Sequence, residues 1–418
     1  MQIVVAGQGY VGLPLAVRAA ELGHRVIGYD VDTHRVQQLA AGQSYVEDVD
    51  SSRLRAVLDS GDYRATADAC DLSGYDVAVI TVPTPLRHGV PDLSYIETCA
   101  RTLGEHLRPG ATVVLESTTY PGCTEELLVP ILEKASSLRA GDDFLAGFSP
   151  ERIAPGNRRF TFDGTPKVVS GIDAKSLDVI KAFYDGIFQT TVPVSGPKVA
   201  ELAKLLENTF RLVNISLMNE LATLAAPLGV NIWEAIDAAA TKPFGFTRFT
   251  PGPGVGGHCL PVDPLFLSWK VEQELGTPFR FVELADDVNR RMPDYVVQRV
   301  VDGLGKRGLR VTRSRILLLG LTYKYNATDL RNSPSERVAE LLTGLGADVR
   351  GADPNVQESD TGKLTVPRVN ASPQEVAAAD AVVLLMDHTR FDLTMIQKHA
   401  SYVLDCRNRL SGSNVETL

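Results

Sequence analysis

The first thirty residues of the chain constrain its fold more than any other segment. An apolar run at residues 2–6 leads into Gly-Gln-Gly-Tyr-Val-Gly at residues 7–12, a helical pattern follows, and a second apolar run ends at Asp30. A bare G-x-G-x-x-G pattern is common, but with a strand before it, a helix after it and an acidic residue closing the next strand it is typical of dinucleotide binding. The segment therefore predicts a Rossmann βαβ unit with a dinucleotide at its glycine turn.

Each glycine of this turn has a predicted role. Gly7 allows the tight turn, Gly9 lets a pyrophosphate reach the backbone, and Gly12 lets the helix pack against the strand. The pyrophosphate would then lie at the helix N-terminus, where unpaired N–H groups favour an anion.

Asp30 indicates which dinucleotide is bound. Its carboxylate can accept hydrogen bonds from the adenosine ribose hydroxyls and would repel the 2′-phosphate of NADP, so we expect NAD. Arg35 leaves NADP as the alternative, because an arginine can accept that phosphate; a solvated arginine on a helix is its other interpretation. The predicted cofactor-binding residues are Gly7, Gly9, Tyr10, Val11, Gly12, Asp30, Arg35, Thr84 and Thr118.

Apolar runs alternate with helical patterns along the rest of the chain, which predicts parallel sheets built from βαβ units. A helical pattern at 199–226 is long enough to bridge two domains, and a second α/β alternation begins at 315. We expect an α/β protein with two Rossmann-like, doubly wound parallel-sheet domains joined by a long central helix. The expected regions are 1–197 for the NAD-binding domain, 198–300 for a central helical dimerisation region with a cysteine loop, and 301–418 for the second Rossmann-like domain.

Composition excludes several classes of function. A formal charge of −9 and a pI near 5.4 argue against nucleic-acid binding and against docking on an anionic membrane. The five cysteines are widely spaced and contain no C-x-x-C pair, so we expect neither a disulfide framework nor a metal site. The first strand begins at residue 2 and no apolar run approaches the length of a membrane span, so we expect a cytoplasmic protein.

A glycine- and proline-rich segment at 251–263 sets Cys259 between His258 and Asp263. Glycines at 254, 256 and 257 would let a bulky ligand approach the sulfur, which indicates thiolate chemistry. A small buried cysteine in a turn is an equally good interpretation of this segment alone.

Further polar positions lie where a ligand site is expected. Lys204, Asn208 and Arg211 share one face of the long helix, either as site residues or as its solvent-facing side. The segments 81–85, 116–122 and 148–156 each follow an apolar strand. They are either ordinary turns or the carboxyl-edge loops that bind ligands in open α/β sheets.

Together these residues resemble the UDP-glucose/UDP-N-acetylhexosamine/GDP-mannose 6-dehydrogenase family, over nearly the whole chain from Gly7 to Asp405. The resemblance implies an NAD-binding domain, a dimerisation helix that makes the protein a homodimer, and a C-terminal domain that holds a nucleotide sugar. It also implies oxidation of the sugar C6 alcohol to a carboxylate with two NAD⁺ and one water.

The resemblance assigns roles residue by residue. It makes Cys259 the nucleophile that forms a thiohemiacetal and then a thioester, and it makes Lys204 and Asn208 the groups that stabilise the C6 oxyanion. General-base duty stays open among Lys204, Asp263 and Glu151. The implied catalytic residues are Cys259, Lys204, Asn208, Asp263, Glu151 and Thr118, and the implied substrate-binding residues are Glu151, Arg152, Lys204, Asn208, Arg211, Phe249, Gly256, Lys324 and Arg331.

Two positions bear on the substrate. Pro155 stands where enzymes for UDP-glucose usually carry a second glutamate, and His258 stands where they tend to have Ser or Tyr, which favours UDP-N-acetylglucosamine or UDP-N-acetylmannosamine. His258 can equally be a structural imidazole. The alternatives are a UDP-glucose or GDP-mannose 6-dehydrogenase, a two-electron hydroxyacid dehydrogenase of the 6-phosphogluconate type, and an inactive NAD-responsive binding protein.

Overall fold

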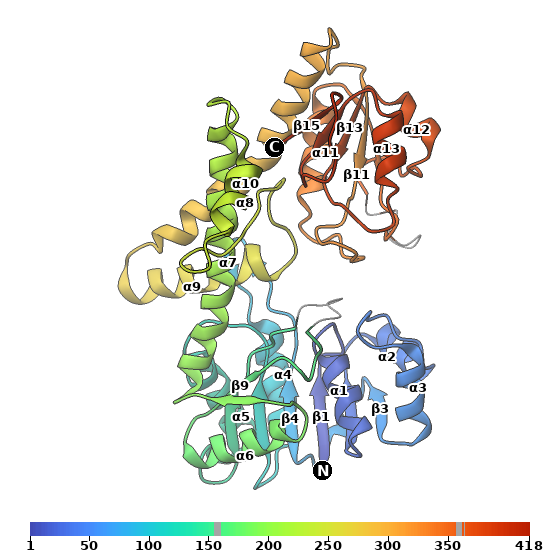
Figure 1. Cartoon of the computed structure of the whole chain (residues 1–418). Coiled ribbons are helices and arrows are strands. Elements are labelled where there is room, and N and C mark those ends of the chain that lie inside the picture. The colour runs from blue at the N-terminus through green and yellow to red at the C-terminus, as the bar shows by residue number, and fades with distance from the viewer. Residues whose placement is uncertain (154–159, 357–361, 363) are drawn as a thin grey trace. The chain divides into compact units, whose positions relative to one another are not determined.

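The computed structural model of the chain describes residues 1–153, 160–356, 362 and 364–418. They form two compact units (Figure 1). The first contains Met1–Glu207 and Trp269–Gly276, and the second contains Asn208–Ser268 and Thr277–Leu418. The expected fold class, with two Rossmann-like sheets and a long helix, is confirmed.

The first unit is built on an eight-stranded sheet in the order β10-β9-β8-β7-β4-β1-β2-β3. The strand order reverses between β1 and β4, so the loops at the carboxyl ends of these two strands flank the switch point where such sheets bind ligands. The strands are β1 (Gln2–Ala6), β2 (Arg25–Tyr29), β3 (Tyr63–Thr66), β4 (Val77–Ile80), β7 (Thr112–Leu115), β8 (Leu145–Phe148), β9 (Lys167–Gly171) and β10 (Thr191–Pro193). A two-stranded hairpin of β5 (Leu86–Arg87) and β6 (Val90–Pro91) stands apart from this sheet.

The pairing of β9 departs from the expected parallel order. β9 runs antiparallel to β8, whereas the other neighbouring strands of this sheet pair in parallel. The described residues of the connection, 149–153 and 160–166, contain no crossover helix. An antiparallel pair needs no crossover helix, whereas a parallel pair does.

Helices cover the first sheet. The apolar sides of α1, α2, α3 and α6 share one core with alternate strand residues, and the intervening strand residues are buried too, as expected for a parallel sheet covered on both faces. An aspartate caps the N-terminus of four of these helices: Asp32 for α2, Asp50 for α3, Asp68 for η1 and Asp173 for α6. The helices are α1 (Gly12–Glu21), α2 (Thr33–Ala40), α3 (Ser51–Asp59), η1 (Ala69–Leu72), α4 (Ser94–Glu105), η2 (Thr124–Leu128), α5 (Val129–Ser136) and α6 (Ala174–Asp185).

Helix α7 (Pro197–Ala225) is one continuous helix of 29 residues. At about 1.5 Å per residue it is roughly 43 Å long. The boundary between the two units falls inside this helix, between Glu207 and Asn208.

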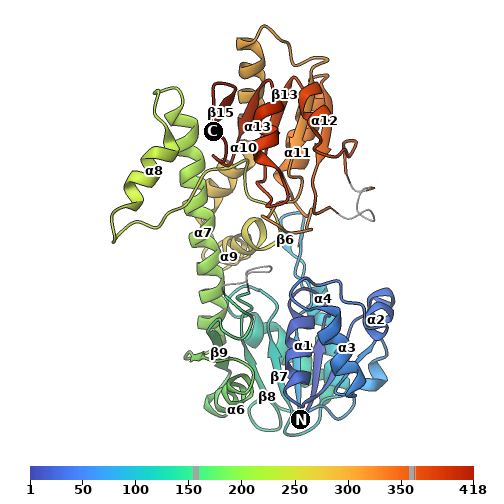
Figure 2. The same cartoon turned by 45° about the vertical axis from the view of Figure 1, so that its right-hand side comes forward.

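The second unit carries a five-stranded parallel sheet in the order β12-β11-β13-β14-β15. Helices α10 and α11 pack on one face of the sheet, and α12 and α13 pack on the other (Figure 2). The strands are β11 (Arg315–Leu319), β12 (Asp348–Ala352), β13 (Ala381–Leu384), β14 (Val403–Asp405) and β15 (Val415–Thr417). The remaining helices are α8 (Ile232–Ala240), α9 (Cys259–Leu275), α10 (Arg280–Lys306), α11 (Pro334–Gly344), α12 (Pro373–Ala378) and α13 (Leu393–His399).

Candidate active site

The glycine turn after β1 has the geometry that a dinucleotide requires. Gly7 has a φ of +93°, and a Cβ there would lie 2.8 Å from the carbonyl oxygen of Thr81. A Cβ on Gly12 would lie 1.8 Å from the carbonyl oxygen of Gly7, so α1 can start here only with glycine. Gly9 has open space where its Cβ would be, which leaves room for a pyrophosphate at the N-terminus of α1.

Asp30 is fixed at the end of β2 in an orientation suited to a ribose. The backbone N–H of Gln8 donates to one carboxylate oxygen (2.8 Å) and that of Asp32 donates to the other (2.9 Å). The Arg35 guanidinium lies 3.7 Å from Asp30 and 3.4 Å from Asp32. Two carboxylates therefore neutralise Arg35, which disfavours a second role as a receptor for a 2′-phosphate.

Of the other predicted cofactor residues, two belong to the glycine turn and two lie in segments that follow neighbouring strands. Tyr10 is exposed and Val11 is half-buried at the start of α1. Thr84 is buried in the segment after β4, and Thr118 is half-buried in the segment after β7. All four lie at the carboxyl edge of the first sheet.

Loop 148–153 brings predicted catalytic residues of the first unit together. The Lys204 ammonium on α7 donates to the backbone carbonyl of Glu151, and Lys204 is buried. Arg152 donates to the carbonyl of Pro166 (2.7 Å) and forms an ion pair with Glu207 of α7 (2.7 Å). The loop is thereby tied to α7 at two points. Pro155 lies outside the described residues.

Sequence reasoning missed three charged or polar groups behind this loop. Lys167, the first residue of β9, lies 2.9 Å from Glu116 and 3.9 Å from Glu151, measured from its ammonium to the nearer carboxylate oxygens. The Tyr184 hydroxyl on α6 donates to Glu116 (2.5 Å). The sequence contained one signal of this cluster, a lysine at the first position of an otherwise apolar strand. The sequence did not indicate which residues that lysine contacts.

In the second unit, Cys259 is the first residue of α9 and is exposed. The glycine- and proline-rich segment 251–263 predicted a loop around Cys259, whereas a helix begins at that residue. Prolines in the first turns of a helix cost few of its hydrogen bonds. The sulfur therefore lies at the positive end of the helix dipole, which favours an anion.

Asn208 and Asp263 contact each other next to the start of α9. The Asn208 side-chain amide donates to Asp263 (2.6 Å), and both residues are buried. His258 lies 3.9 Å from the other Asp263 oxygen. Burial lowers the pKa of His258, and Arg331 lowers it further while Asp329 opposes, so at neutral pH this is an uncharged imidazole beside a carboxylate.

The glycines before Cys259 pack against the segment 320–332. A Cβ on Gly256 would lie 2.6 Å from Asn332 and from Tyr323, and a Cβ on Gly257 would lie 2.5 Å from the Tyr323 ring. The backbone N–H of Gly257 donates to the carbonyl of Arg331 (2.9 Å). Protein atoms fill the space beside these two glycines, which explains why glycine is needed there, and the approach of a ligand to Cys259 stays a prediction. The two glycines bring the cysteine loop against the predicted nucleotide-sugar segment.

The remaining predicted substrate residues have these positions. Arg331 is exposed and forms an ion pair with Asp329 (2.6 Å), and Lys324 is half-buried in the same segment. Arg211 is exposed on α7. Phe249 packs edge-on against Phe210, with ring centroids 5.7 Å apart.

A buried aspartate and histidine anchor segment 320–332. Asp353 accepts from the backbone N–H groups of Leu321 (2.7 Å) and Thr322 (2.9 Å). The His388 Nδ1 accepts from the backbone N–H of Asn326 (2.9 Å), so its proton lies on Nε2, 3.0 Å from Asp353. These contacts fix the first half of a segment that carries Lys324 and Arg331.

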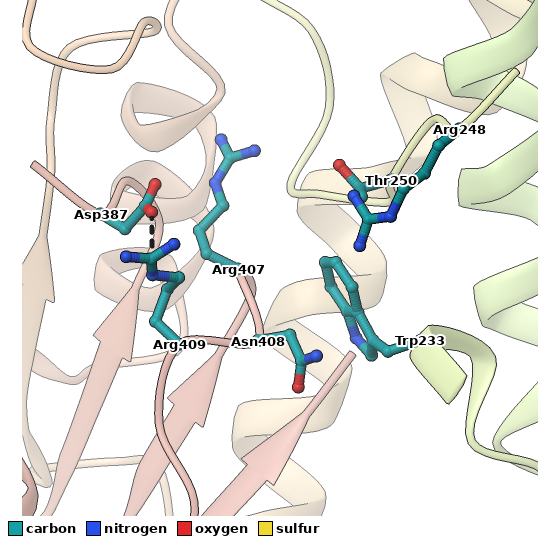
Figure 3. A pocket seen from close by; sticks show the side chains of 7 residues that line it. All are labelled: Trp233, Arg248, Thr250, Asp387, Arg407, Asn408 and Arg409. Atoms are coloured by element: carbon teal, nitrogen blue, oxygen red, sulfur yellow. Dashed lines mark ion pairs between the residues drawn. The ribbon is translucent and has the colours of Figure 1, made fainter. Parts of the chain in front are cut away.

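The carboxyl edge of the second sheet also holds an arginine-rich cavity of about 280 Å³ (Figure 3). Arg407 and Arg409 follow β14, Asp387 follows β13, and the Arg409 guanidinium pairs with Asp387 (3.3 Å). Asp387 pairs with Arg409 and Asp237 pairs with Arg248 (2.7 Å), so three guanidinium groups stand against two carboxylates, and the excess positive charge favours an anionic ligand. Sequence reasoning missed this cavity; its lining residues are Trp233, Arg248, Thr250, Asp387, Arg407, Asn408 and Arg409.

No group of three or more His, Cys, Asp or Glu side chains among the described residues is arranged to hold a metal ion. No helix within the described ranges is long and apolar enough to cross a membrane.

A dinucleotide turn on one sheet, an arginine-rich carboxyl edge on another and a cysteine at a helix N-terminus define the class of an NAD-dependent dehydrogenase. The chain belongs to the UDP-glucose/GDP-mannose dehydrogenase family. The family's NAD-binding domain matches residues 1–188, its central domain 198–291 and its UDP-binding domain 317–412. The family resemblance, the enzyme class, NAD as cofactor and a nucleotide sugar as substrate are thereby confirmed.

Relatives cover nearly the whole chain. The UDP-N-acetyl-D-mannosamine dehydrogenase of Pyrococcus horikoshii is 36% identical over 94% of this chain and 90% of its own length. The UDP-N-acetyl-D-glucosamine 6-dehydrogenase of Pseudomonas aeruginosa is 37% identical over 94% of this chain and 91% of its own length. A solved structure of UDP-D-ManNAc dehydrogenase from P. horikoshii superimposes with a TM-score of 0.90 at 34% identity, covering 100% of this chain and 99% of that one.

Proposed function

We propose that this chain oxidises the C6 alcohol of a UDP-N-acetylhexosamine, UDP-N-acetylglucosamine or UDP-N-acetylmannosamine, to the uronic acid in a four-electron reaction. The names of the relatives support this substrate class. The observation that carries the proposal is Cys259 at the start of α9, on a loop hydrogen-bonded to the segment of Lys324 and Arg331. A two-electron hydroxyacid dehydrogenase has no need of such a cysteine.

In this proposal Cys259 links the two oxidations. Its sulfur adds to the C6 aldehyde and the carbonyl oxygen takes a proton, which gives a thiohemiacetal. Oxidation of that adduct leaves a thioester, and water cleaves it to the carboxylate and the regenerated thiol. NAD, when bound, supplies the acceptor for both oxidations. A serine would serve poorly, because its alkoxide is scarce at neutral pH.

Polar side chains would stabilise the charges that form on oxygen. Lys204 and Asn208, one helical turn apart on α7, are the proposed donors to the C6 oxyanion. Asn208 is oriented by its bond to Asp263. Thr118 and Glu151 would position water and assist proton transfer. Glu151, Asp263 and Lys204 remain the three candidates for the general base.

The second sheet would bind the nucleotide end of the substrate at its carboxyl edge. Lys324 and Arg331 are the proposed ligands of the diphosphate. The cavity of Arg407 and Arg409 offers further guanidinium groups at the same edge, where doubly wound sheets bind their ligands.

His258 is our proposed marker of the N-acetylhexosamine branch. It lies beside both Cys259 and Asp263, so it can influence the shape of the site near the sugar. UDP-glucose and GDP-mannose remain the alternative substrates.

We also propose a homodimer through α7, a cytoplasmic location, and the three regions 1–197, 198–300 and 301–418 as functional divisions. The dimer is supported by a stripe of exposed apolar residues on α7, because such faces mark interfaces. The location is supported by the cosubstrates, since NAD and nucleotide sugars are cytoplasmic metabolites. The stripe consists of Val199, Leu202, Leu206, Phe210, Leu217, Leu221 and Leu224.

Counting NADH against limiting sugar tests the proposal. UDP-N-acetylglucosamine, UDP-N-acetylmannosamine, UDP-glucose and GDP-mannose are supplied in separate reactions, and absorbance is followed to completion. Two NADH per sugar with an N-acetylhexosamine are expected. Two with UDP-glucose or GDP-mannose would move the chain to the alternative branch. One NADH per sugar would remove the thioester route.

A further inference from the structure

A chain of buried charges lies behind Glu151 in the first unit. Glu116 at the end of β7, Lys167 at the start of β9 and Glu151 after β8 come from three neighbouring strands. The side chain of Lys167 is 3% exposed and that of Glu116 is 1% exposed. None of the roles proposed above uses Glu116 or Lys167.

Lys167 stands between the two carboxylates. Its ammonium is 2.9 Å from Glu116 and 3.9 Å from Glu151. Burial holds the pKa of Tyr184 well above its ordinary value, so its hydroxyl stays protonated and donates to Glu116. Glu116 therefore contacts two groups, Lys167 and Tyr184, and Lys167 also faces Glu151.

The charge balance of this cluster depends on Lys167. Two carboxylates share one ammonium in a site where water screens little, so each charge acts strongly on the others. The groups facing Glu151 are Lys167 from β9, Glu116 from β7 and Lys204 from α7, and Lys204 is bonded to the Glu151 carbonyl instead of its carboxylate. Without Lys167, the charges left to act on Glu151 would be those of Glu116, which raises its pKa, and Lys204, which lowers it.

We propose that Lys167 is a positioning residue whose charge favours the ionised form of Glu151, so that the Glu151 carboxylate can accept a proton released at the sugar C6 oxygen. The inference rests on the proposed function, in which Glu151 assists proton transfer. The proton moves from the C6 hydroxyl to a Glu151 oxygen and from there to solvent, and Lys167 and Glu116 exchange no proton. The pKa of Glu151 is raised overall, chiefly by burial; the Lys167 charge opposes that rise, and the Glu116 charge adds to it.

Removing the Lys167 charge and removing the Glu116 charge should shift the pH of half-protonation of Glu151 in opposite directions. Lys167→Met removes the opposing positive charge and should move the pH of half-protonation of Glu151 upward by about one unit or more. Glu116→Gln removes a like charge and should move it downward. The double variant removes one charge of each sign and should fall between the single variants. Lys167→Arg keeps the charge and should stay near wild type.

Two readouts follow these shifts. Infrared difference titration reports protonation of the Glu151 carboxyl, and the band that Glu151→Gln removes is the one to follow. The pH at which kcat falls on the acid side should shift together with the infrared midpoint. For a shift of one unit, kcat of Lys167→Met at acid pH should be about tenfold lower than that of wild type. Lys181→Met is the matched control, because Lys181 forms an exposed ion pair with Asp185 on α6.

The proposal is overturned if Glu151 in Lys167→Met has the same midpoint as in wild type. It is also overturned if the double variant has the same midpoint as Lys167→Met. A simple packing role would lower thermal stability in all variants without opposite shifts. If Lys167→Met does not fold, Lys167→Gln and Glu116→Gln carry the same comparison. Shifted infrared midpoints without NADH from any sugar would end the proposed function and leave the charge coupling standing. Two NADH per sugar with unchanged infrared midpoints would support the proposed function and overturn the charge coupling.

Discussion

Cys259 owes its position to glycines that have no room for a side chain. Gly256 and Gly257 lie against Tyr323 and Asn332, so any larger residue there would displace the 320–332 segment or the start of α9. The sulfur is exposed at the end of a helix dipole while its loop is packed against protein. A reactive group on a rigid support is what a covalent mechanism needs.

Replacing the sulfur tests its covalent role. Cys259→Ser is expected to lower steady-state turnover by at least about 10³-fold, the scale on which removal of a nucleophile acts. NAD binding, measured by calorimetry, should stay unchanged, because the glycine turn lies in the other unit. Cys70→Ser is the control, since Cys70 is also an exposed cysteine. Normal oxidation by Cys259→Ser would exclude the thioester.

Lys204 should affect chemistry more than binding. Lys204→Ala is expected to lower kcat by about 10² to 10³-fold, the usual cost of losing one oxyanion donor. The KM for the nucleotide sugar should change much less. An effect found only in KM would contradict the oxyanion role.

At the scale of elements, the 320–332 segment depends on one buried carboxylate. Asp353 accepts two backbone N–H groups and contacts His388. Burial acts to raise the pKa of Asp353, but His388 and the N–H donors outweigh it and the net pKa is lowered from 3.8. The carboxylate is thus ionised in the folded state to lower pH than in the unfolded chain. Its contribution to stability is present above pH 3.8 and is lost as pH falls through and below that value.

Asp353→Asn should weaken this anchoring and flatten its pH dependence. We expect the second unit to lose about 1 to 3 kcal/mol at neutral pH, because the N–H donors lose a charged acceptor. Its free energy of unfolding should also fall less steeply below pH 3.8 than that of wild type. Urea unfolding in a Trp269→Phe background isolates the signal of Trp233, the remaining tryptophan, which lies in this unit.

The control for this prediction is Asp348→Asn. Asp348 is an exposed aspartate on the same strand that pairs with Arg350 at 3.4 Å. Equal acid slopes for Asp353→Asn and wild type would show that Asp353 is not the group responsible.

The elements that the sequence predicts are those with a local signal, and the features that it does not predict depend on how distant strands are paired. The glycine turn, the buried strands and α7 were predictable, because their signals are local: a motif, an apolar run and a helical period. The antiparallel pairing of β9 was not, since a buried strand has the same composition in either direction. Lys167 was missed for a related reason. Its partners Glu116 and Glu151 come from other strands, and only sheet order brings the three together.

At the scale of the whole molecule, the exposed apolar stripe on α7 predicts a second copy of the chain. Its members recur at helical spacing, so they form one face. Leu221→Glu with Leu224→Glu places two charges in that face and should convert a dimer to a monomer in analytical ultracentrifugation. Leu345→Glu changes an exposed leucine outside α7 and should leave the dimer intact. A double variant that sediments like wild type would move the interface elsewhere.

The position of Arg35 bears on which cofactor pool, NAD or NADP, the enzyme reduces. The cation that an NADP enzyme would need is already present beside the ribose site, and two aspartates occupy it. The preference for NAD here depends on the charge of Asp30, whose oxygens also accept the backbone N–H groups of Gln8 and Asp32. A substitution at Asp30 would therefore act on the backbone beside the glycine turn as well as on the choice between NAD and NADP.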